Sequence, residues 1–145
     1  MRRFVVLKVT LALIACSCSP APDDGRVDAA AVRQIQLLNP SAPLPPSASN
    51  VWFVEKHFLD TYQMVRFDAS LADARAFARN LLDGRSPVRG HDPRLQYFGT
   101  DLEWWLRDFP ANAEGGAKHD GHLRAQVVIV PDNERATVWA LMFSD

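Results

Sequence analysis

Aromatic and β-branched residues are concentrated in the C-terminal part of this chain. Every aromatic residue except Phe4 lies at or beyond Trp52. Two short runs rich in such residues, at 51–58 and 62–67, are separated only by residues 59–61. Runs of this length and composition on either side of a short connection predict two strands joined as a β-hairpin.

The clearest single element that the sequence predicts is a helix over residues 70–84. Ser70 and Asp73 have the spacing of a capping box at a helix N-terminus. Apolar positions then recur with helical spacing on one face, at Leu71, Ala74, Phe77, Ala78 and Leu81. Gly84 stands where a left-handed residue commonly ends a helix, so it marks the expected C-terminus.

A second helix is predicted over residues 100–110. Thr100 and Glu103 have the spacing of another capping box, and Pro110 is expected to end the segment. The length between these signals allows about two helical turns. We therefore expect a short helix here, following the loop that leads away from the main helix.

The last part of the chain predicts a second hairpin. Residues 122–130 and 135–143 are two apolar runs that flank a turn at 131–134, with the sequence Pro-Asp-Asn-Glu. Both runs are nearly continuous rather than alternating, which is typical of strands with both faces covered. The two strands are therefore expected at central positions in the sheet.

Together these elements predict one small α+β domain over residues 50–145. The expected architecture has two layers, with a four-stranded antiparallel sheet packed by one main helix in the order ββα(α)ββ. About 95 residues are enough for a single hydrophobic core. No internal repeat and no second domain is indicated by the pattern.

The first fifteen residues have the features of a secretory signal peptide. Arg2 and Arg3 give a basic start, and an apolar stretch interrupted by Lys8 follows. That stretch is about half of the ~20 residues that a membrane-spanning helix needs. A basic start, a short apolar run and a small residue at its end are typical of an export signal.

The end of this run resembles the lipobox of bacterial lipoproteins. Leu13-Ile14-Ala15-Cys16 has an aliphatic residue, a second aliphatic residue, alanine and then cysteine. The resemblance implies that a diacylglycerol is attached to the Cys16 thiol and that the leader 1–15 is removed. It also implies that the new amine is acylated, with palmitate as the expected acyl group. Two alternatives stay open, an ordinary signal peptide cut nearby and an uncleaved N-terminal anchor.

The residue after the cysteine indicates where such a lipoprotein would be delivered. Ser17 follows Cys16, and in the family's sorting rule a residue other than aspartate favours transfer to the outer membrane. Cys18 is the only other cysteine, and a disulfide closed over two residues is strained and stabilises little. Lipid chemistry therefore explains the cysteine usage better than a disulfide does.

Residues 16–49 are predicted to be a lipid-anchored flexible tether. They contain no aromatic residue and six of the ten prolines, so they lack the means to form a core. Residues 28–38 can form a short helix capped by Asp28 and stopped by Asn39-Pro40. Such a helix either docks on the domain or only fluctuates, and the rest of the segment is expected to be extended.

The overall layout resembles that of small, largely uncharacterised bacterial lipoproteins. The features in common are the lipobox, the proline-rich tether and an entry at Pro46-Ser47-Ala48. A strand from Asp60 to Phe67 and a helix with phenylalanine near its middle complete the resemblance. It implies lipidation and a place in the bacterial envelope, and it implies no activity.

The balance of charged residues argues against two classes of binding partner. The chain has 16 Lys and Arg against 17 Asp and Glu. Without Arg2, Arg3 and Lys8 of the leader, 13 basic residues remain against 17 acidic ones, a net charge of −4. Nucleic-acid binding needs a clustered basic face, so this balance argues against it. It also argues against adhesion to anionic lipid through charge alone.

Few residues have the chemistry of a catalytic or metal site, and no cofactor is expected. His119 and His122 have a spacing that can bind a metal ion, but a zinc enzyme needs a third protein ligand such as His91. The alternative is that these histidines are solvated loop residues. This pattern supports a small periplasm-facing hydrolase or metal-binding protein only as a second hypothesis.

The first hypothesis is a protein-interaction module at the membrane, of inhibitor, immunity or assembly type. Trp104 and Trp105 are its candidate contact residues, because adjacent residues on a helix point about 100° apart. One of the two can then be exposed, and tryptophan is enriched at the centres of protein interfaces. The alternative is that both rings pack inside the domain.

Overall fold

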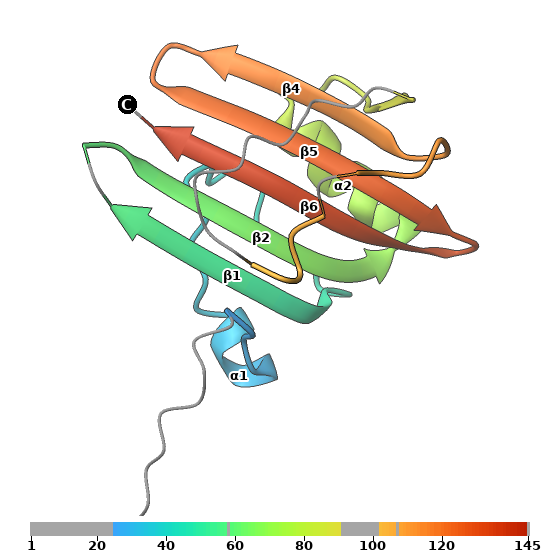
Figure 1. Ribbon diagram of the computed structural model, residues 1–145, viewed down its shortest axis with the longest axis horizontal. Coiled ribbons are helices and arrows are strands. Elements are labelled where there is room, and N and C mark those ends of the chain that lie inside the picture. Colours follow the sequence, from blue (N-terminus) through green and yellow to red (C-terminus); the bar gives the residue numbers. More distant parts are fainter. Residues whose placement is uncertain (1–24, 58, 91–101, 107, 145) are drawn as a thin grey trace, which may run out of the picture.

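The computed structural model describes residues 25–57, 59–90, 102–106 and 108–144. One antiparallel sheet is the main element of this part of the chain, and only a small part is helical (Figure 1). The elements are α1 (Ala29–Val32), β1 (Ser49–His57), β2 (Thr61–Ser70), α2 (Leu71–Leu81), β3 (Val88–Arg89), β4 (Glu114–Asp120), β5 (Leu123–Asp132) and β6 (Arg135–Ser144).

The sheet has six strands in the order β1-β2-β6-β5-β4-β3. The expected α+β two-layer domain, a four-stranded ββα(α)ββ sheet packed by one main helix, is therefore wrong. β3 and β4 extend the sheet beyond the two predicted hairpins, and the helical part of the described residues is small. Both hairpins themselves are present, as β1–β2 and β5–β6. The nearly continuous apolar run of β6 fits its position, since β6 pairs with β2 on one side and β5 on the other.

β4 escapes prediction because its first residues, Glu114-Gly115-Gly116, look like a flexible loop. A Cβ at Gly116 would lie 2.5 Å from Cδ1 of Leu82, which follows α2. A side chain at this position would therefore force the Leu82 side chain to shift where the end of the helix approaches the strand. Two residues further on, the buried Lys118 forms an ion pair with Asp83 at 2.7 Å. β4 is thus fixed to the C-terminal end of α2.

The predicted helix over 100–110 is absent from the described part of that segment, residues 102–106 and 108–110. These residues form turns, one of them closed by a hydrogen bond from the Trp105 amide to the Leu102 carbonyl at 3.1 Å. Trp104, Trp105 and Phe109 all contact one face of the sheet. The packing of these three large rings on the sheet outweighs the capping signals that predicted a helix. Thr100, the first residue of the predicted capping box, lies outside the described residues.

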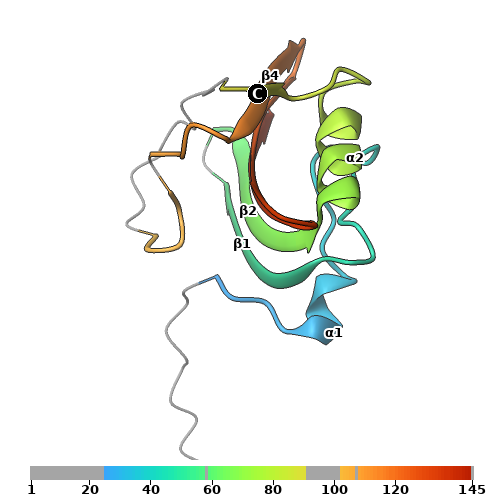
Figure 2. The same ribbon diagram turned by 90° about the vertical axis from the view of Figure 1, so that its right-hand side faces the viewer.

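α2 confirms the clearest prediction. The Ser70 hydroxyl accepts a hydrogen bond from the Asp73 amide at 3.1 Å, as a capping residue does. Ala74, Phe77 and Ala78 are among the residues that the helix buries against the sheet. Gly84 follows with a φ of +84°, the left-handed conformation expected after a helix. Figure 2 shows α2 on one side of the sheet.

The first face of the sheet, beneath α2, carries the main core. Inward side chains come from β2, β5 and β6, and they include Phe67, Ile129 and Met142. The second face carries a smaller aromatic cluster with Tyr62 and Trp139. The segment that includes residues 102–106 and 108–113 lies over this second face (Figure 2).

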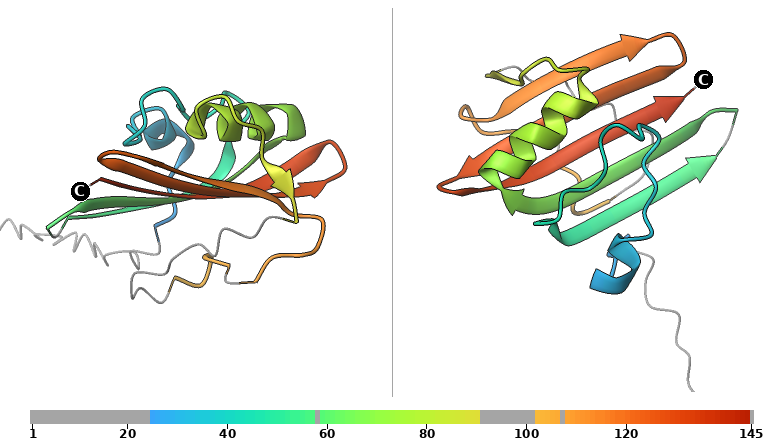
Figure 3. Two further views of the ribbon diagram at one scale, coloured as in Figure 1. Left: turned by 90° about the horizontal axis from the view of Figure 1, so that it is seen from above. Right: turned by 180° about the vertical axis from the view of Figure 1, so that it is seen from behind.

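Residues 25–48 are part of the folded domain, so the prediction of a flexible tether is wrong for them. Leu37 and Ala42 are buried against the first face, beside α2 (Figure 3). The buried Gln63 side chain holds this segment, accepting from the Leu38 amide at 2.7 Å and donating to the Gln36 carbonyl at 3.0 Å. Backbone hydrogen bonds can fix a segment that has no aromatic residue.

The helix predicted over 28–38 is present only as the four-residue α1. Asp28 caps it as expected, with its carboxylate accepting from the amides of Ala30 and Ala31. Beyond Val32 the chain turns instead of continuing as a helix. The backbone carbonyl of Gln36 and the amide of Leu38 then form hydrogen bonds with the Gln63 side chain.

No helix in the described part of the chain is long and apolar enough to cross a membrane.

Candidate functional site

A row of alternating arginine and tryptophan residues crosses the second face of the sheet. Arg26 is paired with Trp52 of β1, Trp52 with Arg66 of β2, and Arg66 with Trp139 of β6. Directly paired residues of antiparallel strands place their side chains on the same face. We call Arg26, Trp52, Arg66 and Trp139 the Arg–Trp row.

The guanidinium groups of this row lie close to the indole rings. The Arg66 guanidinium carbon is 4.3 Å from the centre of the Trp52 ring and 5.8 Å from that of Trp139. The Arg26 guanidinium carbon is 5.7 Å from the centre of Trp52. All three distances lie within the ~6 Å range of cation–π attraction. Trp52 therefore has a cation on each side across the strands.

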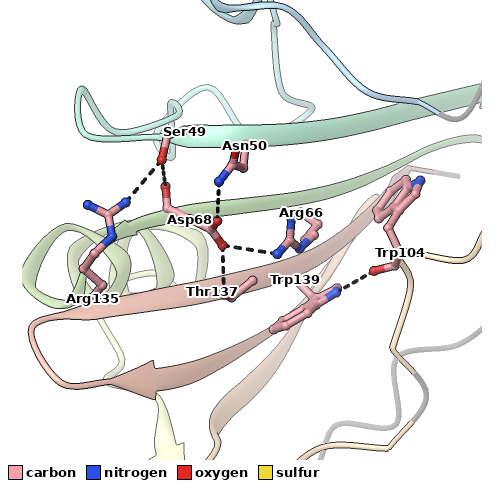
Figure 4. A network of polar contacts seen from close by, with 8 residues as sticks. All are labelled: Ser49, Asn50, Arg66, Asp68, Trp104, Arg135, Thr137 and Trp139. Atoms are coloured by element: carbon pink, nitrogen blue, oxygen red, sulfur yellow. Dashed lines mark hydrogen bonds and ion pairs between the residues drawn. The ribbon is translucent and has the colours of Figure 1, made fainter.

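Asp68 holds the neighbouring row of polar side chains together (Figure 4). Its carboxylate accepts from Asn50 at 2.9 Å and from the Thr137 hydroxyl at 2.8 Å, and it pairs with Arg66 at 3.3 Å. The Ser49 hydroxyl donates to the Asp68 carbonyl and accepts from Arg135. These contacts fix the position of Arg66 from the side opposite its rings.

β1 is irregular next to this network. The pairing register between β1 and β2 shifts between Ser49 and Trp52, which is a β-bulge. Asn50 sits in the bulge with a φ of +48°, a left-handed conformation that is uncommon outside glycine. Bulges re-aim side chains and often occur beside binding sites. Here the bulge directs the Asn50 amide toward Asp68.

This arrangement presents a fixed cation and a ring at the surface. The side chains of Arg66 and Asp68 are each 20% exposed, and Trp52 is half-buried. Trp139 lies beneath, and its indole N–H donates to the Trp104 carbonyl at 3.0 Å (Figure 4). Arginine and tryptophan carry much of the energy at protein interfaces, and a guanidinium held on a ring loses little freedom on binding.

The two tryptophans singled out from the sequence lie beside this row. Trp105 is 4% exposed and Trp104 is half-buried, and their rings meet edge to face with centres 5.6 Å apart. Neither ring is on a helix. Trp105 therefore packs against the sheet, and Trp104 is the one of the pair that borders the surface.

The candidate metal ligands are not brought together in the described residues. His119 is in β4, opposite Arg124 of β5, and His122 follows in the tight turn between these strands. Both are exposed, and the charge of Arg124 across the strands disfavours a cation at His119. No group of three or more potential ligands occurs in the described part of the chain, and His91 lies outside it.

One part of the Arg–Trp row can be recognised from the alternation of polar and apolar positions in the sequence. Arg66 and Asp68 alternate with apolar residues at the end of the second predicted strand, which puts them on one face. Their partners come from other strands, so register is needed to find them. Burial raises the pKa of the Tyr62 phenol, which is also on this face.

Comparison with protein-family models, with curated proteins and with solved structures gives no match. The function is therefore argued from the residues and their geometry. Cys16, the expected lipidation site, lies outside the described residues.

Proposed function

We propose that this protein is a lipid-anchored protein of the bacterial envelope whose domain is a protein-interaction module. The anchor is the lipid on Cys16, and the favoured location is the periplasmic face of the outer membrane. The module is of inhibitor, immunity or assembly type. The observation that carries the proposal is the position of Trp52, at the surface between Arg26 and Arg66.

The early start of the domain supports an anchored role. Only nine residue steps separate Cys16 from Gly25, where the described part of the chain begins. A fully extended chain of that length spans about 30 Å at most. Two or more acyl chains hold a protein firmly in a bilayer. A lipid on Cys16 would therefore keep the domain close to the membrane, where its partner is expected.

The contact surface that we propose is the exposed part of the Arg–Trp row, with Trp104 at its border. Arg26 is exposed and Trp52 and Trp104 are half-buried. The local excess of arginine contrasts with the net negative charge of the mature chain. Arg66 already pairs with Asp68, whereas Arg26 is exposed. Guanidinium groups pair well with carboxylates, so the partner surface expected at Arg26 is acidic.

The test is the recovery of envelope proteins that crosslink to the anchored full-length chain in its own cells. Trp52→Ala should weaken the capture of a specific partner by about 2 kcal/mol or more, roughly 30-fold, if Trp52 is a central contact. Trp52→Phe keeps an aromatic ring beside the Arg66 guanidinium, so this variant should retain most of the capture of the partner protein.

The matched control is Arg79→Ala, an exposed arginine of α2 on the opposite side of the sheet. It should leave capture unchanged. Each variant is compared at equal membrane abundance and with its melting curve recorded. Equal recovery of every crosslinked protein by wild type and Trp52→Ala would contradict the proposed surface.

A further inference from the structure

Two hollows flank the segment that contains α1. The first has a volume of about 760 Å³ and lies between α1, residues 43–48 and the start of β1. The second has a volume of about 770 Å³ and lies on the other side, toward Phe53 and Gln63. In the right-hand view of Figure 3, the loop that follows α1 lies beside α2, and α1 lies beyond the β1 edge of the sheet.

The two hollows are separate. Val27 and Ile35 line both of them, so these two residues form the boundary between one hollow and the next. Each hollow falls within the range of volumes that small-molecule sites have. The first hollow is the candidate binding site.

The walls are mainly apolar. The first hollow is lined by valine, isoleucine, leucine and proline side chains, which include Val32, Leu44 and Pro46. Val32, Ile35 and Leu44 belong to the main core cluster but are only partly buried. Apolar surface is thus left uncovered beside a packed core, and an alkyl chain would cover it at about 0.8 kcal/mol per CH₂.

The charges of the first hollow favour an anion. Arg33 lines it at the end of α1 and is exposed, and Arg26 lines it as well. The one carboxylate among the lining residues, that of Asp28, is turned to the amides of Ala30 and Ala31. The guanidinium of Arg33 therefore attracts a negatively charged head group. The carboxylate of Asp28 is already hydrogen-bonded to the first turn of α1.

We propose that the first hollow is a binding site for a fatty acid. Its alkyl chain lies along Val27, Val32 and Ile35, and its carboxylate lies at Arg33. The occupant is a free fatty acid rather than a bilayer surface, because the apolar walls are a concave recess. The proposal does not depend on the lipid on Cys16, and the hollow shares only Arg26 with the Arg–Trp row.

The experiment is a calorimetric titration of the full chain carrying Cys16→Ser, which has no attached acyl chain of its own. Decanoate, below its micellar range, is compared with 1-decanol and with hexanoate. Decanoate should bind once per chain and about fivefold more tightly than decanol. Four fewer CH₂ groups should weaken hexanoate at least 100-fold.

Arg33→Gln should lower decanoate affinity to that of decanol and leave decanol binding unchanged. The matched control Arg79→Gln should alter neither. Val32→Trp and Leu44→Trp fill the first hollow from two different sides, and each should reduce decanoate binding more than 50-fold while the chain still melts cooperatively.

Three results would overturn the proposal. The first is no decanoate binding to the Cys16→Ser chain at millimolar concentration. The second is equal loss in Arg33→Gln and Arg79→Gln. The third is undiminished binding in whichever of Val32→Trp and Leu44→Trp is folded. None of these results bears on the Trp52 crosslinking experiment, so the two proposals fail separately.

Discussion

Phe77→Ala is expected to lower the free energy of unfolding by about 3–5 kcal/mol. Phe77 is 2% exposed, and its ring meets that of Phe67 edge to face with centres 5.0 Å apart. Its loss leaves a cavity between α2 and the sheet. The total stability of a domain of this size is about 5–15 kcal/mol, so the change should be evident in urea unfolding.

Arg79→Ala is the control on the same helix, because Arg79 is exposed and should shift the unfolding free energy by about 0.5 kcal/mol or less. If the Phe77→Ala protein unfolds at the same urea concentration as the wild type, the Phe77 ring does not pack in the core between α2 and the sheet.

A chain that begins at Asn50 is expected not to fold cooperatively. It lacks Leu37 and Ala42, which are buried in the main core, and the backbone groups of Gln36 and Leu38 that satisfy the buried Gln63 side chain. Burying one leucine contributes about 1.5–3 kcal/mol, and several partly buried apolar side chains are lost with it.

The matched comparison is a chain that begins at Gly25 and keeps every described residue. Thermal melting followed by near-ultraviolet circular dichroism should show a sharp transition for this chain and none for the one beginning at Asn50. A cooperative melt of the shorter chain, close to that of the longer one, would show that residues 25–48 add no essential core.

The elements that the sequence predicted well are those whose signal is local. α2 has its cap, its apolar face and its final glycine within fifteen residues, and the structure confirms all three. Both hairpins were visible as pairs of apolar runs around short turns. Local periodicity and turn chemistry were sufficient in these places because no distant partner had to be known.

The errors occur where a distant residue decides the structure. Gly116 looks like part of a flexible loop until Leu82 is placed against it. The segment at 25–48 looks like a tether until Gln63, buried in β2, is seen to bind its backbone. Capping signals near Trp104 are overridden by the aromatic face of the sheet. Tertiary contacts outweigh local propensity in each case.

The candidate site was even less accessible to prediction. Its residues come from the segment before β1 and from β1, β2 and β6, and only the register brings Arg26, Trp52, Arg66 and Trp139 into one row. Trp104 and Trp105 drew attention because they are adjacent and bulky. Trp52 and Trp104 are both half-buried, and Trp52 is the one with a cation on either side of its ring.

The proposed function depends most on a lipid at Cys16, since that anchor would place the domain at the membrane. The direct measurement is metabolic labelling with an alkyne fatty acid, followed by detection of the tagged chain in the wild type and in Cys16→Ser and Cys18→Ser variants. Wild type and Cys18→Ser should be labelled and shortened by the leader 1–15, whereas Cys16→Ser should be unlabelled and keep its leader. Undiminished labelling of Cys16→Ser would contradict the account.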